Sequence, residues 1–242
     1  MRVYRSFSWK NTNLRVACEA FDLVTRTVVE ERRQLERYIA RHPAFLCALE
    51  PLPLLDDPPE AARRMTAAAE LTGLGPMAAV AGTLAQLGVE AALVSGCAEA
   101  IVENGGDIFL FAALPVTIAI HTGGAAIGSR LALRIEPHQT PLALCSSSST
   151  MGHSLSLGRC DLATVVSRNA ALADAAATLV GNLVLREGDL TSVLEQVGAI
   201  PGIDGILAVK NGRIGLWGQL PQLVRNEDAA TGSKITRDSG AS

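Results

Sequence analysis

Three polar segments of the chain carry residues that can bind an anion or a cation. The first is Asn104-Gly105-Gly106-Asp107, which lies between two apolar arms that are expected to be strands. Paired glycines permit positive φ angles and let the backbone approach a ligand closely. The Asn104 amide both donates and accepts hydrogen bonds, so it could anchor a phosphate or a base. The same four residues also fit an ordinary hairpin turn, and both interpretations stay open.

The second segment is a run of hydroxyl side chains that follows the apolar stretch 141–145. It consists of Ser146, Ser147, Ser148, Ser149 and Thr150. Hydroxyl groups and loop N–H groups suit phosphate oxygens, so this loop predicts a site for an anionic ligand. His153, three residues further on, could act as a base, as a phosphate partner or as a capping residue. The alternative is a flexible serine-rich surface loop.

The third segment, Ala173–Thr178, places a carboxylate in an alanine-rich stretch. In a helix, Asp174 and Thr178 are four residues apart and lie on one face. A buried carboxylate must be paired or bound to a cation, and hard oxygen ligands suit Mg²⁺. The alternative is that Asp174 only interacts with the helix dipole, which is weak five residues past Asn169. Together, the three segments indicate one anionic ligand held with a metal ion.

Apolar periodicity predicts the elements that position these segments. Strands are expected over residues 3–7, 14–18, 100–102, 108–112, 116–121, 130–136, 141–145, 162–167, 205–209 and 213–217. Helices are expected over residues 22–41, 60–71, 77–94, 170–184 and 189–196, with Asp22 and Asn169 as caps. Strands in hairpin-like runs and helices in blocks indicate an α+β fold. The two alanine-rich helices, each tied to a polar loop, point to a duplicated plan.

Composition limits the class of protein. The chain has 242 residues, of which 48% are apolar and 4% aromatic, and its net charge is -3. It has no basic stripe, which argues against binding to nucleic acid. The five cysteines include no C-x-x-C pair, so neither a disulfide framework nor a zinc site is expected.

The apolar stretch 77–96 approaches the length of a membrane span. It contains Gln86 and Glu90 and is otherwise mostly Ala, Gly and Val, so a buried helix is the better interpretation. The N-terminus lacks the apolar core of a signal peptide. We therefore expect one cytoplasmic domain over residues 1–227, without membrane association, and a disordered tail over residues 228–242.

Four stretches resemble motifs of the ApbE-type FAD:protein FMN transferases. Asn104–Ile108 resembles their N-x-G-G-D-I signature, and Ser146–Ser149 looks like their S-T-S-G loop. Val165–Thr178 resembles their V-x-V strand and A-D-A-L-A-T segment, and Gly75–Gly82 is similar to their glycine- and alanine-rich helix. The chain resembles most closely a compact ApbE-related branch, over nearly its whole length.

The resemblance implies a single domain of two related α/β halves, similar to a T-fold. It also implies FAD as the donor, Mg²⁺ as a cofactor and transfer of FMN to a protein acceptor. Carried over, Asp174 and Thr178 would bind the metal together with a backbone carbonyl near Gly82. The nucleotide would be held by residues of the other two segments: Asn104, Gly105, Gly106, Asp107, Ser146, Ser147, Ser148, Ser149 and Thr150. His153 and Asp174 would be catalytic, and a homo-oligomer is a further expectation.

The chain also departs from the family pattern. The D-P-x-T-G motif that the transferases carry after the serine loop is missing, since only 151–160 fills that gap. Asn11-Thr12-Asn13-Leu14 stands where the close branch has E-T-D-L. Two alternatives therefore accompany a transferase or FAD pyrophosphatase: a non-catalytic binder of a flavin, nucleotide or pterin-like ligand, and a serine hydrolase that uses Ser146–Ser149 with His153.

Overall fold

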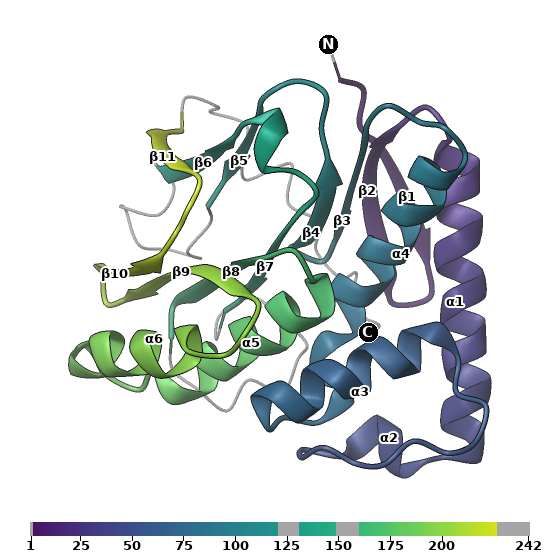
Figure 1. Ribbon diagram of the computed structural model, residues 1–242, viewed down its shortest axis with the longest axis horizontal. Coiled ribbons are helices and arrows are strands. Elements are labelled where there is room, and N and C mark those ends of the chain that lie inside the picture. The colour runs from purple at the N-terminus through teal and green to yellow at the C-terminus, as the bar shows by residue number, and fades with distance from the viewer. Residues whose placement is uncertain (1, 121–130, 149–159, 227–242) are drawn as a thin grey trace.

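The computed structural model describes residues 2–120, 131–148 and 160–226, which form two antiparallel sheets and a layer of helices (Figure 1). The larger sheet has eight strands in the order β1-β2-β3-β4-β7-β8-β9-β10. Its strands are β1 (Arg5–Trp9), β2 (Thr12–Cys18), β3 (Ala100–Asn104), β4 (Asp107–Phe111), β7 (Leu142–Ser147), β8 (Leu162–Ser167), β9 (Ile203–Lys210) and β10 (Arg213–Gly218). All neighbouring strands of this sheet are antiparallel.

The large sheet contains the same plan twice. In the first half, the hairpin β1–β2 is followed by helices and then by β3–β4, which pairs with β2. In the second half, β7–β8 is followed by helices and then by β9–β10, which pairs with β8. The two halves join where β4 pairs with β7. The expected α+β architecture with two related halves is therefore confirmed.

Helices cover one face of the large sheet, on the lower and right sides of Figure 1. They are α1 (Phe21–Arg41), α2 (Ala44–Cys47), α3 (Glu60–Thr72), α4 (Val80–Val94), α5 (Ala170–Leu183) and α6 (Leu190–Gly198). One apolar cluster joins α1, α4, α5 and α6 to the sheet, while α2 and α3 pack in a second cluster further from it. The many alanines of α4 and α5 fit this position, because small side chains allow helices and sheet to approach closely.

Two predicted helix starts need correction. Asp22 does not cap α1, because the helix already begins at Phe21 and Ala20 is its N-cap. The helix expected from residue 77 starts as a separate 3-10 turn, η1 (Pro76–Ala79), and becomes α-helical only at Val80. By contrast, Asn169 caps α5 as predicted, since its side-chain oxygen accepts a hydrogen bond from the Leu172 N–H at 3.2 Å.

The other face of the large sheet is covered by a three-stranded sheet in the order β11-β6-β5, at the upper left of Figure 1. Its strands are β5 (Val116–Ala119), β6 (Leu131–Ile135) and β11 (Gln222–Arg225). Strand β11 was not predicted from the sequence, because a four-residue strand with mostly exposed side chains has no strong apolar pattern. The tail over residues 228–242 lies outside the described residues.

The stretch Pro76–Val94 is long and apolar enough to cross a membrane by length and composition. In the fold it is a core helix, because Leu84, Ala85, Val89 and Ala92 of α4 are all buried. These side chains belong to the cluster that joins the helices to the large sheet. The expectation of a buried helix in a folded domain is confirmed.

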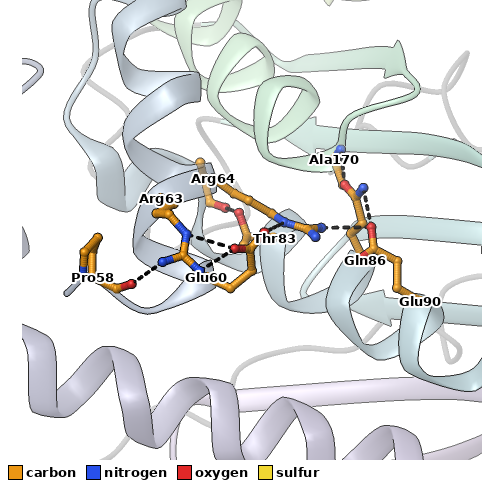
Figure 2. Close-up of polar contacts among 9 residues, drawn as sticks. Pro58, Glu60, Arg63, Arg64, Thr83, Gln86, Glu90 and Ala170 are labelled. Carbon is orange, nitrogen blue, oxygen red and sulfur yellow. Dashed lines mark hydrogen bonds and ion pairs between the residues drawn. The ribbon is translucent and has the colours of Figure 1, made fainter. Parts of the chain in front are cut away.

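A polar network fixes α3, α4 and α5 relative to one another (Figure 2). Arg64 of α3 binds Glu60 at 2.7 Å and reaches Glu90 of α4 at 2.8 Å. Glu90 also accepts a hydrogen bond from the Gln86 side chain at 2.9 Å, and the Gln86 oxygen accepts one from the Ala170 N–H at 2.8 Å. Gln86 thereby serves an N–H group at the start of α5 that has no partner within its own helix.

Candidate functional site

The Asn104–Asp107 segment forms the turn of the β3–β4 hairpin, with Asn104 paired to Asp107. Gly105 and Gly106 have φ angles of 64° and 105°, which residues with a side chain rarely adopt. The flanking side chains are buried and do more than close a turn. The Asn104 amide donates to the Ala81 carbonyl at 3.1 Å, and Asp107 Oδ1 accepts from the Ser146 N–H at 3.1 Å. The hairpin therefore contacts both α4 and β7.

Asp174 lies in the middle of α5 and faces the beginning of α4. Its Oδ2 atom accepts a hydrogen bond from the Gly82 N–H at 2.9 Å. The two helices touch at this point, since a Cβ atom on Gly82 would lie 2.5 Å from the Ala170 carbonyl oxygen and 2.9 Å from the Asp174 Cβ. Only glycine at position 82 permits this approach. Thr178, one turn after Asp174, is also buried.

The carboxylates of Asp107 and Asp174 influence each other. Burial raises the pKa of Asp107 well above its usual value, and the negative charge of Asp174 raises it further. Burial likewise raises the pKa of Asp174 to about 7, although the N–H groups of Gly82 and Ala81 oppose the shift. Burial and the charges of both carboxylates also raise the pKa of the Cys145 thiol. Segments far apart in the sequence thus meet in one buried and electronegative region.

The serine segment differs from the predicted loop, because Ser146 and Ser147 still belong to strand β7. Strand alternation sends their side chains to opposite faces. Ser146 shares a hydrogen bond of 2.9 Å with Thr164, its register partner on β8, and contributes only its backbone N–H to Asp107. Ser148 donates to the Asp161 carbonyl at 2.7 Å.

Ser147 lies on the same face of β7 as Cys145, toward the helices. The residue is only 6% exposed, and among the described residues its hydroxyl has no hydrogen-bond partner. A buried hydroxyl without a partner is rare, because its desolvation costs about 1–3 kcal/mol. A ligand oxygen could accept the hydrogen bond that this hydroxyl does not make within the described residues.

Ser149, Thr150 and His153 lie outside the described residues. The serine hydrolase that would use Ser146–Ser149 with His153 therefore stays a prediction. In the described part of the segment, Ser146 and Ser148 bond to Thr164 and to a backbone carbonyl, and Ser147 is unpartnered.

The donor set fits a hard cation better than zinc. Within the described ranges, no three His, Cys, Asp or Glu side chains are close enough to hold a metal by themselves. Asp174 and Thr178 offer a carboxylate and a hydroxyl on one helix face. Mg²⁺ is commonly bound by one or two carboxylates, with waters and phosphate oxygens completing its shell. The second buried carboxylate, Asp107, adds negative charge that a cation would balance.

Lys210 was not singled out from the sequence. It ends β9 on the same edge of the sheet as the serine segment and is only 9% exposed. Its amino group lies 3.5 Å from Asp161, the residue whose carbonyl accepts the Ser148 hydrogen bond. The sequence pattern Gly205–Val209 predicted the strand and the following turn, but nothing in it shows that a lysine at the strand end would be buried.

The fold is shared with solved flavin transferases. The chain superposes on "Flavin Transferase ApbE from Vibrio cholerae" with a TM-score of 0.57 at 15% identity, covering 90% of this chain and 96% of that one. It superposes on the Pseudomonas stutzeri flavinyl transferase ApbE with a TM-score of 0.59 at 12% identity, covering 99% and 98%. The chain thus has the fold of the solved ApbE structures.

Proteins that are similar in sequence identify the family of this chain. A UPF0280 protein from Methanocella arvoryzae is 41% identical over 82% of this chain and 81% of its own length. Another from Methanococcus maripaludis is 37% identical over 91% and 92%. The family model described as "AbpE bacteria" matches residues 5–196, and the chain belongs to this family.

Proposed function

We propose that the protein binds a flavin nucleotide together with Mg²⁺ and acts on the pyrophosphate of FAD, as an FMN transferase or an FAD pyrophosphatase. The observation that carries this proposal is a set of three buried polar groups: the carboxylates of Asp107 and Asp174 and the hydroxyl of Ser147, which has no hydrogen-bond partner among the described residues. A cation balances the first two groups, and a phosphate oxygen satisfies the third. The fold shared with solved flavin transferases supports flavin as the ligand.

Each residue has a distinct role in this proposal. Asp174 and Thr178 hold the metal, and the Ala81–Gly82 backbone lies close to it. Asn104, the glycines of the hairpin turn and Ser147 bind the nucleotide. Mg²⁺, when bound, neutralises the pyrophosphate charge, which favours departure of the nucleotide leaving group.

The chain itself contributes positioning and proton transfer. The buried Asn104 and Asp107 side chains at the β3–β4 turn exclude water around the pyrophosphate together with β7, and Lys210 adds a positive charge at the same edge of the sheet. His153 is proposed to move the proton of the attacking hydroxyl. A protein hydroxyl as acceptor, a cytoplasmic location and a homo-oligomer complete the proposal.

Incubation of the purified protein with FAD and Mg²⁺ tests the proposal. The expected result is release of AMP, detected by liquid chromatography, that stops with EDTA and with Asp174→Asn. An exposed carboxylate, Asp204, supplies the matched control Asp204→Asn, which should keep the activity. Release of AMP without Mg²⁺, or equal release by Asp174→Asn, would exclude the proposed role of the site.

A non-catalytic binder is the second candidate, and the missing D-P-x-T-G motif favours it. It predicts tight binding of FAD or a related ligand with no turnover under any divalent metal. Mass spectrometry of small molecules released from the purified protein separates a flavin ligand from a pterin-like one.

A further inference from the structure

Two cysteines lie close together at the two ends of the segment that contains α1, α2, α3 and α4. Cys18 ends β2, and Cys97 lies two residues after the C-cap of α4 and shortly before β3. Their sulfur atoms are 3.7 Å apart, although 79 positions separate them in the sequence. The segment between them, residues 19–96, contains α1, α2, α3 and α4.

The surroundings of the pair leave one sulfur reachable. Cys18 is partly exposed, whereas Cys97 is only 8% exposed and also contacts the Ser95 hydroxyl at 3.6 Å. The other cysteines differ: Cys145 and Cys160 are buried, and Cys47 is exposed on the short helix α2. An oxidant can therefore reach Cys18 first, with a second thiol in contact behind it.

We propose that Cys18 and Cys97 form a reversible disulfide when the protein reacts with a peroxide. This bond would join the two ends of the helical segment 19–96 in a covalent loop. A disulfide bond is about 2.0 Å long, so modest rotations of both side chains bring the sulfurs within bonding distance. The proposal is independent of the function of the Asp174 site.

The reaction balances in two steps. The Cys18 thiolate attacks the peroxide oxygen, which gives a sulfenic acid and releases water after proton transfer. The Cys97 thiolate then attacks the Cys18 sulfur, forms the S–S bond and expels hydroxide, which is protonated to a second water. The two thiols are oxidised by two electrons in total, and the peroxide is reduced to two waters. A dithiol reductant restores both thiols.

The rate should be modest at neutral pH. Burial raises the pKa of Cys18 to about 11, with smaller upward contributions from Cys97 and Glu19, while the Ala20 N–H opposes the shift. Because the thiolate is the reacting form, little of it is present at pH 7. The pair is therefore expected to stay reduced in a reducing compartment and to respond to sustained oxidation.

Peptide mapping of the full-length protein after treatment with hydrogen peroxide tests the proposal. The expected product is a peptide that links Cys18 to Cys97 and disappears after treatment with dithiothreitol. Closing a loop of this length should raise the thermal midpoint by roughly 5–15 °C in the oxidised form. Both effects should be absent in Cys18→Ser and in Cys97→Ala, and unchanged in the control Cys47→Ser.

Two results would overturn the proposal. One is peroxide treatment that leaves Cys18 and Cys97 unlinked, whether as free thiols or as separately oxidised residues. The other is a linked peptide without any rise in the thermal midpoint, because the bond would then not constrain the segment 19–96. Alanine is used at position 97 because Cys97 is buried, and a serine hydroxyl there would be buried as well and would impair folding.

Discussion

The carboxylate of Asp174 accepts a hydrogen bond from the Gly82 N–H at 2.9 Å across 92 positions of sequence. Gly82 lies in the first turn of α4, where N–H groups have no intrahelical partner, so Asp174 acts as a cap from a neighbouring helix. The residue proposed to bind the metal therefore has a structural role as well. Its variants must separate the two roles.

The variant Asp174→Asn distinguishes metal binding from the capping of α4. The asparagine keeps an oxygen that can accept from Gly82 N–H but removes the charge that a cation needs. We expect a folded protein whose Mg²⁺ affinity is at least roughly tenfold weaker. Thermal melts with and without Mg²⁺ measure this, and Asp204→Asn should respond to Mg²⁺ as the unmodified protein does. An Asp174→Asn protein that keeps its full Mg²⁺ response would contradict the assignment.

The pH dependence follows from the pKa of Asp174. This pKa is raised from 3.8 to about 7 in the folded state, so the folded state binds a proton more tightly than the unfolded state between these values. Without metal, the contribution of Asp174 to the free energy of unfolding should fall as pH rises from about 4 to about 7. Mg²⁺ binds the ionised form, so its stabilising effect should be larger at pH 8 than at pH 6.

Denaturant titrations at these two pH values, with Mg²⁺ or EDTA, provide the measurement. In Asp174→Asn, the difference between the Mg²⁺ effects at the two pH values should vanish. A Mg²⁺ effect that is stronger at pH 6 in the unmodified protein would mean that Asp174 is not the titrating ligand.

Gly82→Ala tests the contact between α4 and α5. The added Cβ would lie 2.5 Å from the Ala170 carbonyl oxygen, which belongs to the backbone and cannot simply rotate away. We expect a loss of about 1–3 kcal/mol in the free energy of unfolding, measured by chemical denaturation. Gly188→Ala is the matched control, because an added Cβ there meets nothing within 4 Å. Equal stability of both variants would contradict the close approach.

Ser147→Ala and Ser146→Ala form a second matched pair on neighbouring positions of β7. Removing the unpartnered Ser147 hydroxyl should leave stability unchanged or slightly increased, yet weaken FAD binding by roughly 3–10-fold. Removing the Ser146 hydroxyl breaks its bond to Thr164 and should lower stability by about 1 kcal/mol without affecting FAD. Fluorescence titration and chemical denaturation give the two readouts. The reverse pattern would place the ligand on the other face of β7.

Local features of the sequence predicted much of the fold. The Asn104–Asp107 hairpin, the Asn169 cap and the strand Leu162–Ser167 each depend on residues that are neighbours in sequence. The start of α1 and the onset of α4 were misplaced by one to three residues, since flanking contacts decide where a helix begins.

Features that depend on tertiary contacts could not be predicted in the same way. Whether Ser146 or Ser147 faces the helices depends on how far β7 extends, and the sequence placed the end of this strand two residues too early. The cap that Asp174 provides for α4, the burial of Lys210 and the pairing of β11 with β6 all join distant segments. Such partners carry no signal in local periodicity.

Titration of FAD with the purified protein, followed by quenching of flavin fluorescence, tests the central claim most directly. With Mg²⁺, the account predicts saturable quenching that weakens by roughly tenfold or more in EDTA and in Asp174→Asn. Quenching that is the same with Mg²⁺, with EDTA and in Asp174→Asn, or no quenching under any of these conditions, would contradict it.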